Sequence, residues 1–235
     1  MSVPVVIFSS DNGELYRPFV EPVTASWKNI GFEVMCDIID ENNCYVNPEI
    51  IPYGNQSQMI RALLPALHPE RTFLISDVDM LPLSKKYFTQ VMRLIDNDNK
   101  IVNVSADAYT GQSRLPMCYF AGTGKAFSAV TGIKSREDIS RVMTEWWKRD
   151  KGWETDEICF TEALLTSSAK NEIELSLYKR GWCQGVAIGR IDRGAWVYDK
   201  EALELGAYID SHMLRPFTDY VEQLRPVFRS VGVEI

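Results

Sequence analysis

The chain of 235 residues carries 25 Lys and Arg against 32 Asp and Glu, which gives a formal net charge of −7. Its 46% apolar and 24% charged residues are typical of a globular protein and exclude a disordered tail or a collagen-like fibre. The acidic balance argues against nucleic-acid binding, which depends on clustered Lys and Arg, and a count of two histidines nearly excludes a multi-histidine zinc site.

The first half of the chain alternates between strand-like and helical patterns. Residues 3–8 form a short apolar run rich in β-branched residues that ends in a polar turn, which indicates a buried strand. Further strands are expected at 32–39, 72–76 and 101–105, and helices at 15–30, at 56–67 and from a Ser84 cap to residue 95. Strands that alternate with helices favour an α/β fold with a mostly parallel sheet flanked by helices.

The second half is less regular. Ser135 and Asp138 resemble a capping box ahead of a helix that runs to residue 148, and Thr155 caps a predicted helix that runs to about residue 165. Strand-like pieces are expected at 175–178, 186–191 and 195–197, followed by a surface helix at 217–228 that Pro226 breaks. We find neither an internal repeat nor a long linker, so we expect one domain over residues 1–235.

The termini and the cysteines bear on location. The chain has no run of 18 apolar residues and no N-terminal pattern of a signal peptide. Its five cysteines are odd in number and none forms a C-x-x-C pair. We therefore expect a soluble protein without a membrane span, in a reducing, cytoplasmic compartment.

Two carboxylates follow the predicted strand 72–76. Asp77 and Asp79 flank Val78 just past the strand end, and in an open α/β sheet ligands bind at the carboxyl ends of the strands. Alternation places both side chains on one side of an extended backbone. Two hard oxygen ligands suit Mg²⁺ or Mn²⁺ together with phosphate and water. The alternative is that both aspartates cap a turn or the next helix.

The segment 74–83 around these aspartates resembles the DXD region of GT-A-fold glycosyltransferases. The resemblance implies a GT-A-like, Rossmann-like domain, with a nucleotide-sugar-binding half at 1–110 and an acceptor-binding half at 111–235. It also implies that Asp77, Val78 and Asp79 bind the donor, and that both aspartates bind Mn²⁺ or Mg²⁺.

Other segments fit the same family in the same order. The strand that ends in Ser9, Ser10 and Asp11 resembles its nucleoside-binding loop. The helix that carries Arg61 resembles the one that directs a basic residue toward the donor. Arg61 is equally suited to a surface salt bridge.

The segment 210–216 resembles a late segment of glycogenin-like transferases whose histidine is a third metal ligand. The resemblance makes His212 a metal ligand and Arg215 a donor-binding residue, since Arg forms bidentate pairs with oxyanions. A cap or surface histidine, and a surface salt bridge for Arg215, are the alternatives.

A Gly-rich stretch at 117–124 resembles the Phe-Asn-Ala-Gly stretch of the glycogenin-like group. It implies a donor-binding role for Gly122, where a small residue lets the backbone approach a sugar closely. Phe120 stands where an amide is usual in that group, so no polar role transfers to it. A simple turn is as good an explanation.

Asp156 and Glu157 open the predicted helix 155–165. Carboxylates at a helix N-terminus often only complement the helix dipole. As catalytic residues, either could act as the general base of an inverting transferase or stabilise the oxocarbenium-like state of a retaining one. The sequence does not choose between these outcomes.

The leading hypothesis is a metal-dependent glycosyltransferase that moves a hexosyl or pentosyl group from a nucleotide sugar, most simply a UDP-sugar, to a glycan or other hydroxyl acceptor. One alternative is an Asp-x-Asp phosphohydrolase, but such enzymes usually carry the motif on the first strand. Another is a GT-A-like domain that binds a sugar or nucleotide without turnover.

Overall fold

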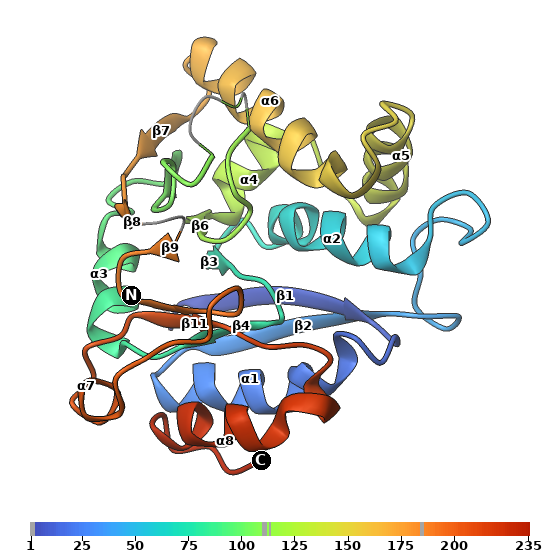
Figure 1. The fold of residues 1–235 in the computed structure, drawn as a ribbon. Coiled ribbons are helices and arrows are strands. Elements are labelled where there is room, and N and C mark those ends of the chain that lie inside the picture. The colour runs from blue at the N-terminus through green and yellow to red at the C-terminus, as the bar shows by residue number, and fades with distance from the viewer. Residues whose placement is uncertain (1–2, 110–111, 113, 184–185) are drawn as a thin grey trace.

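The computed structural model describes residues 3–109, 112, 114–183 and 186–235, and it has a six-stranded sheet at its centre (Figure 1). The strand order is β2-β1-β3-β6-β5-β7. Five of these strands run parallel: β1 (Val5–Asp11), β2 (Glu33–Ile39), β3 (Thr72–Ile75), β5 (Lys100–Asn103) and β7 (Glu174–Leu177). Within this sheet β6 (Phe120–Thr123) is antiparallel to both its neighbours. The predicted α/β fold with a mostly parallel sheet is confirmed.

Helices cover both faces of the sheet (Figure 1). One layer contains α2 (Tyr53–Leu63), α4 (Gly124–Thr131), α5 (Arg136–Trp147) and α6 (Thr155–Ala169). The other contains α1 (Val20–Asn29), α3 (Lys85–Arg93) and α8 (Val221–Arg229).

The pattern of β1 explains the two layers. Val5 and Ile7 pack into the core on one side, whereas Val6 and Phe8 pack into the core on the other side. Successive side chains of a strand point to opposite faces, so a strand that is covered on both faces reads as a continuous apolar run. This is why polar and apolar residues do not alternate in residues 3–8.

A second, three-stranded sheet lies beside the first and was not predicted. In it β11 (Asp210–His212) pairs in parallel with β10 (Arg190–Asp192) and antiparallel with β4 (Met80–Pro82). The register sets His212 opposite Met80 on one side and Asp192 on the other. The chain that follows Asp77 and Asp79 is thereby joined to the segment that carries His212.

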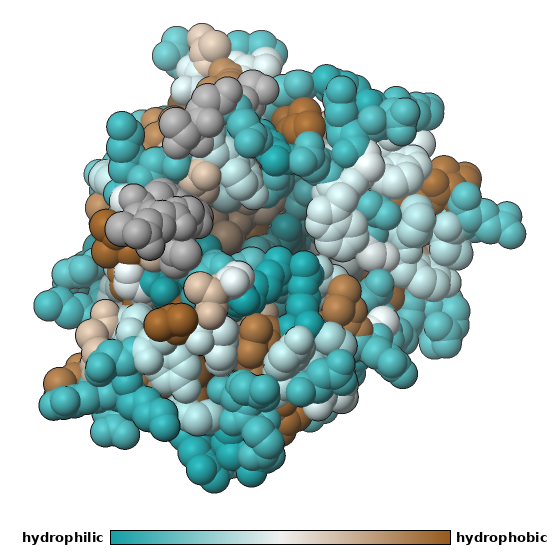
Figure 2. All heavy atoms as spheres, in the orientation of Figure 1, coloured by the Kyte–Doolittle hydropathy of each residue, from teal (hydrophilic) through white to brown (hydrophobic). Residues whose placement is uncertain are grey.

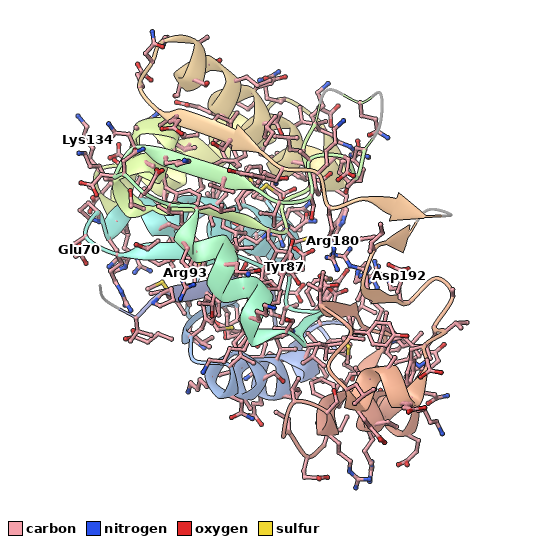
Figure 3. All side chains as sticks on the ribbon, turned by 90° about the vertical axis from the view of Figure 1, so that its left-hand side faces the viewer. Glu70, Tyr87, Arg93, Lys134, Arg180 and Asp192 are labelled. Atoms are coloured by element: carbon pink, nitrogen blue, oxygen red, sulfur yellow. The ribbon has the colours of Figure 1, made fainter. Side chains whose placement is uncertain are left out.

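Buried ion pairs fix this second sheet. The carboxylate of Asp210, fully buried, accepts hydrogen bonds from Arg180 at 2.6 and 2.8 Å and from Arg190 at 3.1 and 3.0 Å. Figure 3 shows Arg180 close to Tyr87 of α3, and its guanidinium carbon lies 5.9 Å from the centre of that ring. Two guanidinium groups satisfy one buried carboxylate, so ion pairs as well as backbone hydrogen bonds hold the strand that carries His212.

The remaining elements are short. β8 (Trp182–Cys183) pairs with β9 (Val186–Ala187), and α7 (Lys200–Glu204) precedes β11. Single turns of 3₁₀-helix occur at η1 (Arg17–Phe19), η2 (Leu64–Leu67), η3 (Gly152–Glu154) and η4 (Phe217–Tyr220). Within the described part of the chain, the helices are all too short or too polar to cross a bilayer.

Several local predictions differ from the structure. Thr155 is the first residue of α6 rather than its cap, and the strand expected at 186–191 is split into β9 and β10. The helix expected at 15–30 starts only after a loop and η1. The strand expected at 195–197 is wrong, because backbone N–H groups of Ala195 and Trp196 both bond to the carbonyl of Asp192 and close a turn. Pro226 lies inside α8 without ending it. The helix loses one backbone hydrogen bond there, but Leu224 and Phe228 still pack into the core.

Candidate active site

A polar cavity of about 290 Å³ opens where β1 and β3 end, at the carboxyl edge of the sheet. Figure 2 shows a hollow with hydrophilic residues around it on this face of the molecule. Its lining is rich in charge of both signs. Among the described residues, the charged side chains that line it are Arg61, Asp77, Asp79, Arg114, Glu154, Asp156, Glu157, Arg193, His212 and Arg215.

Asp79 is buried at the floor of the cavity and has cationic groups on several sides. Its Oδ2 accepts a hydrogen bond of 2.7 Å from Arg193 and lies 3.6 Å from Nε2 of His212 and 3.8 Å from Arg215. Burial alone raises the pKa of Asp79, but the contact with His212 and the charges of His212 and Arg193 outweigh it, so the pKa is lowered. Asp79 is therefore a carboxylate at neutral pH.

His212 is held between two carboxylates. Its Nδ1 lies 3.5 Å from Oδ2 of Asp192, while Nε2 faces Asp79. Burial lowers the pKa of His212, but the contacts with Asp192 and Asp79 more than offset it and raise the pKa above 6.5. A carboxylate on one ring nitrogen orients the ring and directs the other nitrogen, which is how ligand histidines are commonly positioned.

Asp77 takes part in a different set of contacts. Its carboxylate pairs with Arg61 of α2, whose other terminal nitrogen donates a 2.9 Å hydrogen bond to Asp156 at the start of α6. Asp156 is almost fully buried, and burial raises its pKa even though the charge of Arg61 and its hydrogen bond oppose the shift. Arg61 thus joins the end of β3 to the start of α6 across the cavity wall.

Glu157, next along α6, has partners of its own. Oε1 accepts a 2.8 Å hydrogen bond from the hydroxyl of Tyr109, and Oε2 lies 3.3 Å from Arg114. Burial raises the pKa of Glu157, while the hydrogen bond from Tyr109 lowers it, and the net shift is upward. Its side chain is 17% exposed against 1% for Asp156, so Glu157 is the more accessible carboxylate.

Aromatic rings lie at the rim. Tyr16 and Trp153 stack with their centres 6.5 Å apart and their planes 15° apart, and the guanidinium of Arg215 lies 5.0 Å from the centre of the Tyr16 ring. Trp153 is 56% exposed although it lines the cavity. An exposed indole at a cavity rim offers a flat apolar face to a ligand.

The structure brings together most of the predicted site residues. Ser9, Ser10, Arg61, Asp77, Val78, Asp79, Asp156, Glu157, His212 and Arg215 all line the cavity. Asp11 does not line it, and its carboxylate instead accepts from the N–H of Gly13. Gly122 does not line it either. It lies within β6, where a Cβ would meet Ile101 and the carbonyl of Lys100 at 3.0 Å.

Sequence reasoning missed Tyr16, Tyr109, Arg114 and Arg193, which also line the cavity. Arg193 had a usable local signal, since it stands in an Asp-Arg-Gly turn directly after a predicted strand. Tyr109 and Arg114 had none, because they lie on an irregular stretch whose position depends on contacts with α6.

The residues present fit a divalent cation as a two-ligand site. Ligands about 2.1 Å from one ion lie roughly 3–4 Å apart, and Asp79 Oδ2 and His212 Nε2 are separated by 3.6 Å. A carboxylate with an imidazole suits Mn²⁺. Asp77 is turned to Arg61, and in the described ranges no three His, Cys, Asp or Glu side chains are grouped as metal ligands. Phosphate oxygens and water would have to complete the shell.

The comparison with solved structures bears on the fold. The chain aligns with the crystal structure of a glycosyltransferase involved in the glycosylation of the major capsid of PBCV-1, with a TM-score of 0.50 and 11% sequence identity. The alignment covers 94% of this chain and 98% of that chain. The chain therefore shares the α/β architecture of that structure, with a mostly parallel sheet flanked by helices, which is consistent with the expected GT-A-like fold. No protein-family model and no curated protein sequence matches the chain.

Proposed function

We propose that this protein is a metal-dependent glycosyltransferase that moves a sugar from a nucleotide-diphosphate sugar, a UDP-sugar, to a hydroxyl group of a glycan or another acceptor. The observation that carries the proposal is the pair of Asp79 and His212, 3.6 Å apart on the floor of a cavity at the carboxyl edge of the sheet. The GT-A-like fold supports it, since the protein with the similar structure is a glycosyltransferase.

In this proposal the donor diphosphate lies over Asp79 and His212. These two residues would hold Mn²⁺ or Mg²⁺, which when bound supplies Lewis-acid stabilisation of the diphosphate leaving group. Arg215 borders the same carboxylate and is placed to bind a phosphate oxygen. Ser9 and Ser10, at the end of β1, line the side of the cavity where the nucleoside would bind.

The acceptor side would lie toward α6. Glu157 is the more exposed of the two candidate carboxylates, and its raised pKa suits a group that takes a proton from the acceptor hydroxyl. Asp156, almost fully buried and bound to Arg61, would position the donor-side residues. Trp153 offers a stacking face for an acceptor sugar, since sugars present C–H faces to indole rings.

The test combines binding and turnover. UDP binding is measured by calorimetry with and without Mn²⁺, and sugar release is measured over a panel of UDP-sugars, for the native protein, Asp79→Ala and the exposed control Asp98→Asn. We expect Mn²⁺-dependent binding and turnover that Asp79→Ala abolishes and Asp98→Asn leaves intact.

Three results would contradict the proposal. Activity that is unchanged without Mn²⁺ and unchanged in Asp79→Ala would refute metal dependence. Release of phosphate from simple phosphomonoesters would favour a phosphohydrolase. Metal-dependent UDP binding without turnover on any donor or acceptor would indicate a binding domain.

A further inference from the structure

Among the residues that the structure describes, four arginines line the cavity, and their partners differ. Arg61 is shared between Asp77 and Asp156, and Arg114 between Glu154 and Glu157. The other two, Arg193 and Arg215, are both directed at the single carboxylate of Asp79. Two guanidinium groups that share one carboxylate with His212 leave an excess of N–H donors and of positive charge on the cavity floor.

Arg193 makes the closest of these contacts. Its Nη1 donates to Oδ2 of Asp79 at 2.7 Å, whereas Nη1 of Arg215 is 3.8 Å away. A guanidinium carries five N–H donors in a planar fork, so one bond to Asp79 leaves others for a second oxyanion. The Arg193 side chain is 28% exposed, so it can reach a ligand in the cavity.

The backbone around Arg193 is held by Asp192. Oδ1 of Asp192 accepts from the N–H of Gly194 at 2.8 Å, and its carbonyl accepts from the N–H of Trp196 at 2.7 Å. Oδ2 of the same Asp192 carboxylate lies 3.5 Å from His212, so one residue fixes both the histidine ring and the turn that carries Arg193. Figure 3 shows Asp192 at the end of its strand, where this turn begins.

The oxygen that Arg193 contacts is the one that also faces His212 Nε2. A divalent cation between Asp79 and His212 would bind this same Oδ2, and its charge would repel the guanidinium that donates to that oxygen. The guanidinium and the metal ion therefore compete for Asp79.

Resting on the proposed function, we propose that Arg193 is a diphosphate-binding residue that gives up Asp79 Oδ2 to the divalent cation and binds the donor phosphates instead. Arg193 would then lower the affinity for the metal ion alone and raise the affinity for the metal–nucleotide pair. The class of ligand is a nucleoside diphosphate with its cation. Binding of metal and nucleotide would be coupled through this side chain.

Calorimetry with MnCl₂ alone, and with UDP at saturating Mn²⁺, tests this proposal without a turnover assay. The proteins are the native chain, Arg193→Gln, Arg193→Lys and the control Arg141→Gln on the exposed face of α5. For Arg193→Gln we expect Mn²⁺ alone to bind about tenfold tighter and UDP with Mn²⁺ about tenfold weaker, the size of one charge-assisted hydrogen bond. Arg193→Lys keeps the charge, so its Mn²⁺ affinity should stay near that of the native protein.

The outcomes separate the two proposals. A native protein whose UDP affinity is the same with and without Mn²⁺ contradicts metal dependence itself, before any variant is measured. The competition between Arg193 and the metal ion is overturned if Arg193→Gln does not bind Mn²⁺ alone more tightly than the native protein does. Unchanged UDP affinity in Arg193→Gln overturns the phosphate role. Circular dichroism of each variant establishes that the fold is intact.

Discussion

Asp79 and His212 face each other across 3.6 Å because β4, which begins directly after Asp79, pairs antiparallel with β11, which ends at His212. The backbone N–H of Met213 also donates to the carbonyl of Asp79 at 2.9 Å. The backbone therefore fixes the separation of the two side chains.

The first prediction concerns the pH dependence that His212 gives to stability. Its folded pKa lies above 6.5, since the contacts with Asp192 and Asp79 outweigh burial. A group whose pKa rises on folding stabilises the folded state. This stabilisation is complete below the pKa of the unfolded chain and is lost as the pH rises through the pKa of the folded state. In urea unfolding, His212→Gln should therefore cost more at about pH 6 than at about pH 9, by at most about 1 kcal/mol. A cost that does not vary with pH would contradict the charged histidine.

The second prediction concerns Arg61, which pairs with Asp77 and Asp156. Arg61→Gln leaves Asp156 buried without its partner, so we expect a loss of about 3 kcal/mol in the free energy of unfolding at pH 7. The loss should shrink as the pH falls through the raised pKa of Asp156, because protonation removes the buried charge.

The double variant Arg61→Gln/Asp156→Asn is the control for Arg61. It should regain most of the stability at pH 7, since the buried charge is removed together with its partner. Equal stabilities of the single and double variants in urea unfolding at pH 7 would show that the ion pair is not what holds α2 to α6.

The third prediction concerns Tyr109 and Glu157. The hydroxyl of Tyr109 donates to Glu157 at 2.8 Å and lowers the pKa of that carboxyl, so Tyr109→Phe should raise it. If Glu157 takes the proton of the acceptor, the acidic limb of the pH–rate profile moves to higher pH. Tyr220→Phe, on η4 away from the cavity lining, should leave the profile in place. If the pH–rate profile shifts in neither variant, Glu157 is not the general base.

The fourth prediction concerns Gly122. A Cβ at this position would lie 3.0 Å from both Cγ1 of Ile101 and the carbonyl oxygen of Lys100, so Gly122→Ala overpacks the sheet. We expect a loss of about 1–3 kcal/mol in thermal or urea unfolding. Because Gly122 does not line the cavity, the affinity of the folded variant for UDP with Mn²⁺ should equal that of the native protein. A selective loss of UDP affinity would restore the donor-binding interpretation of this glycine.

Local signals predicted much of the fold because each rests on neighbours in the sequence. Ser84 caps α3 by accepting from the N–H of Tyr87, and Ser135 and Asp138 form the expected capping box of α5. The continuous apolar run of β1 predicted a buried strand, and the structure covers that strand on both faces. The two aspartates at the end of β3 were found by the same logic, since the carboxyl edge of a parallel sheet is where ligands bind.

By itself the sequence determined the α/β class, the order of the main elements and the position of Asp77 and Asp79 after a buried strand. Only the tertiary structure decided that Asp77 pairs with Arg61 while Asp79 faces His212, and that Arg193 and Glu157 lie in the same cavity. Three-residue strands such as β4 and β11 carry too little periodicity to be recognised in isolation. The partner of an arginine depends on which carboxylate the folded chain brings within reach, and that is set by long-range packing rather than by spacing along the sequence.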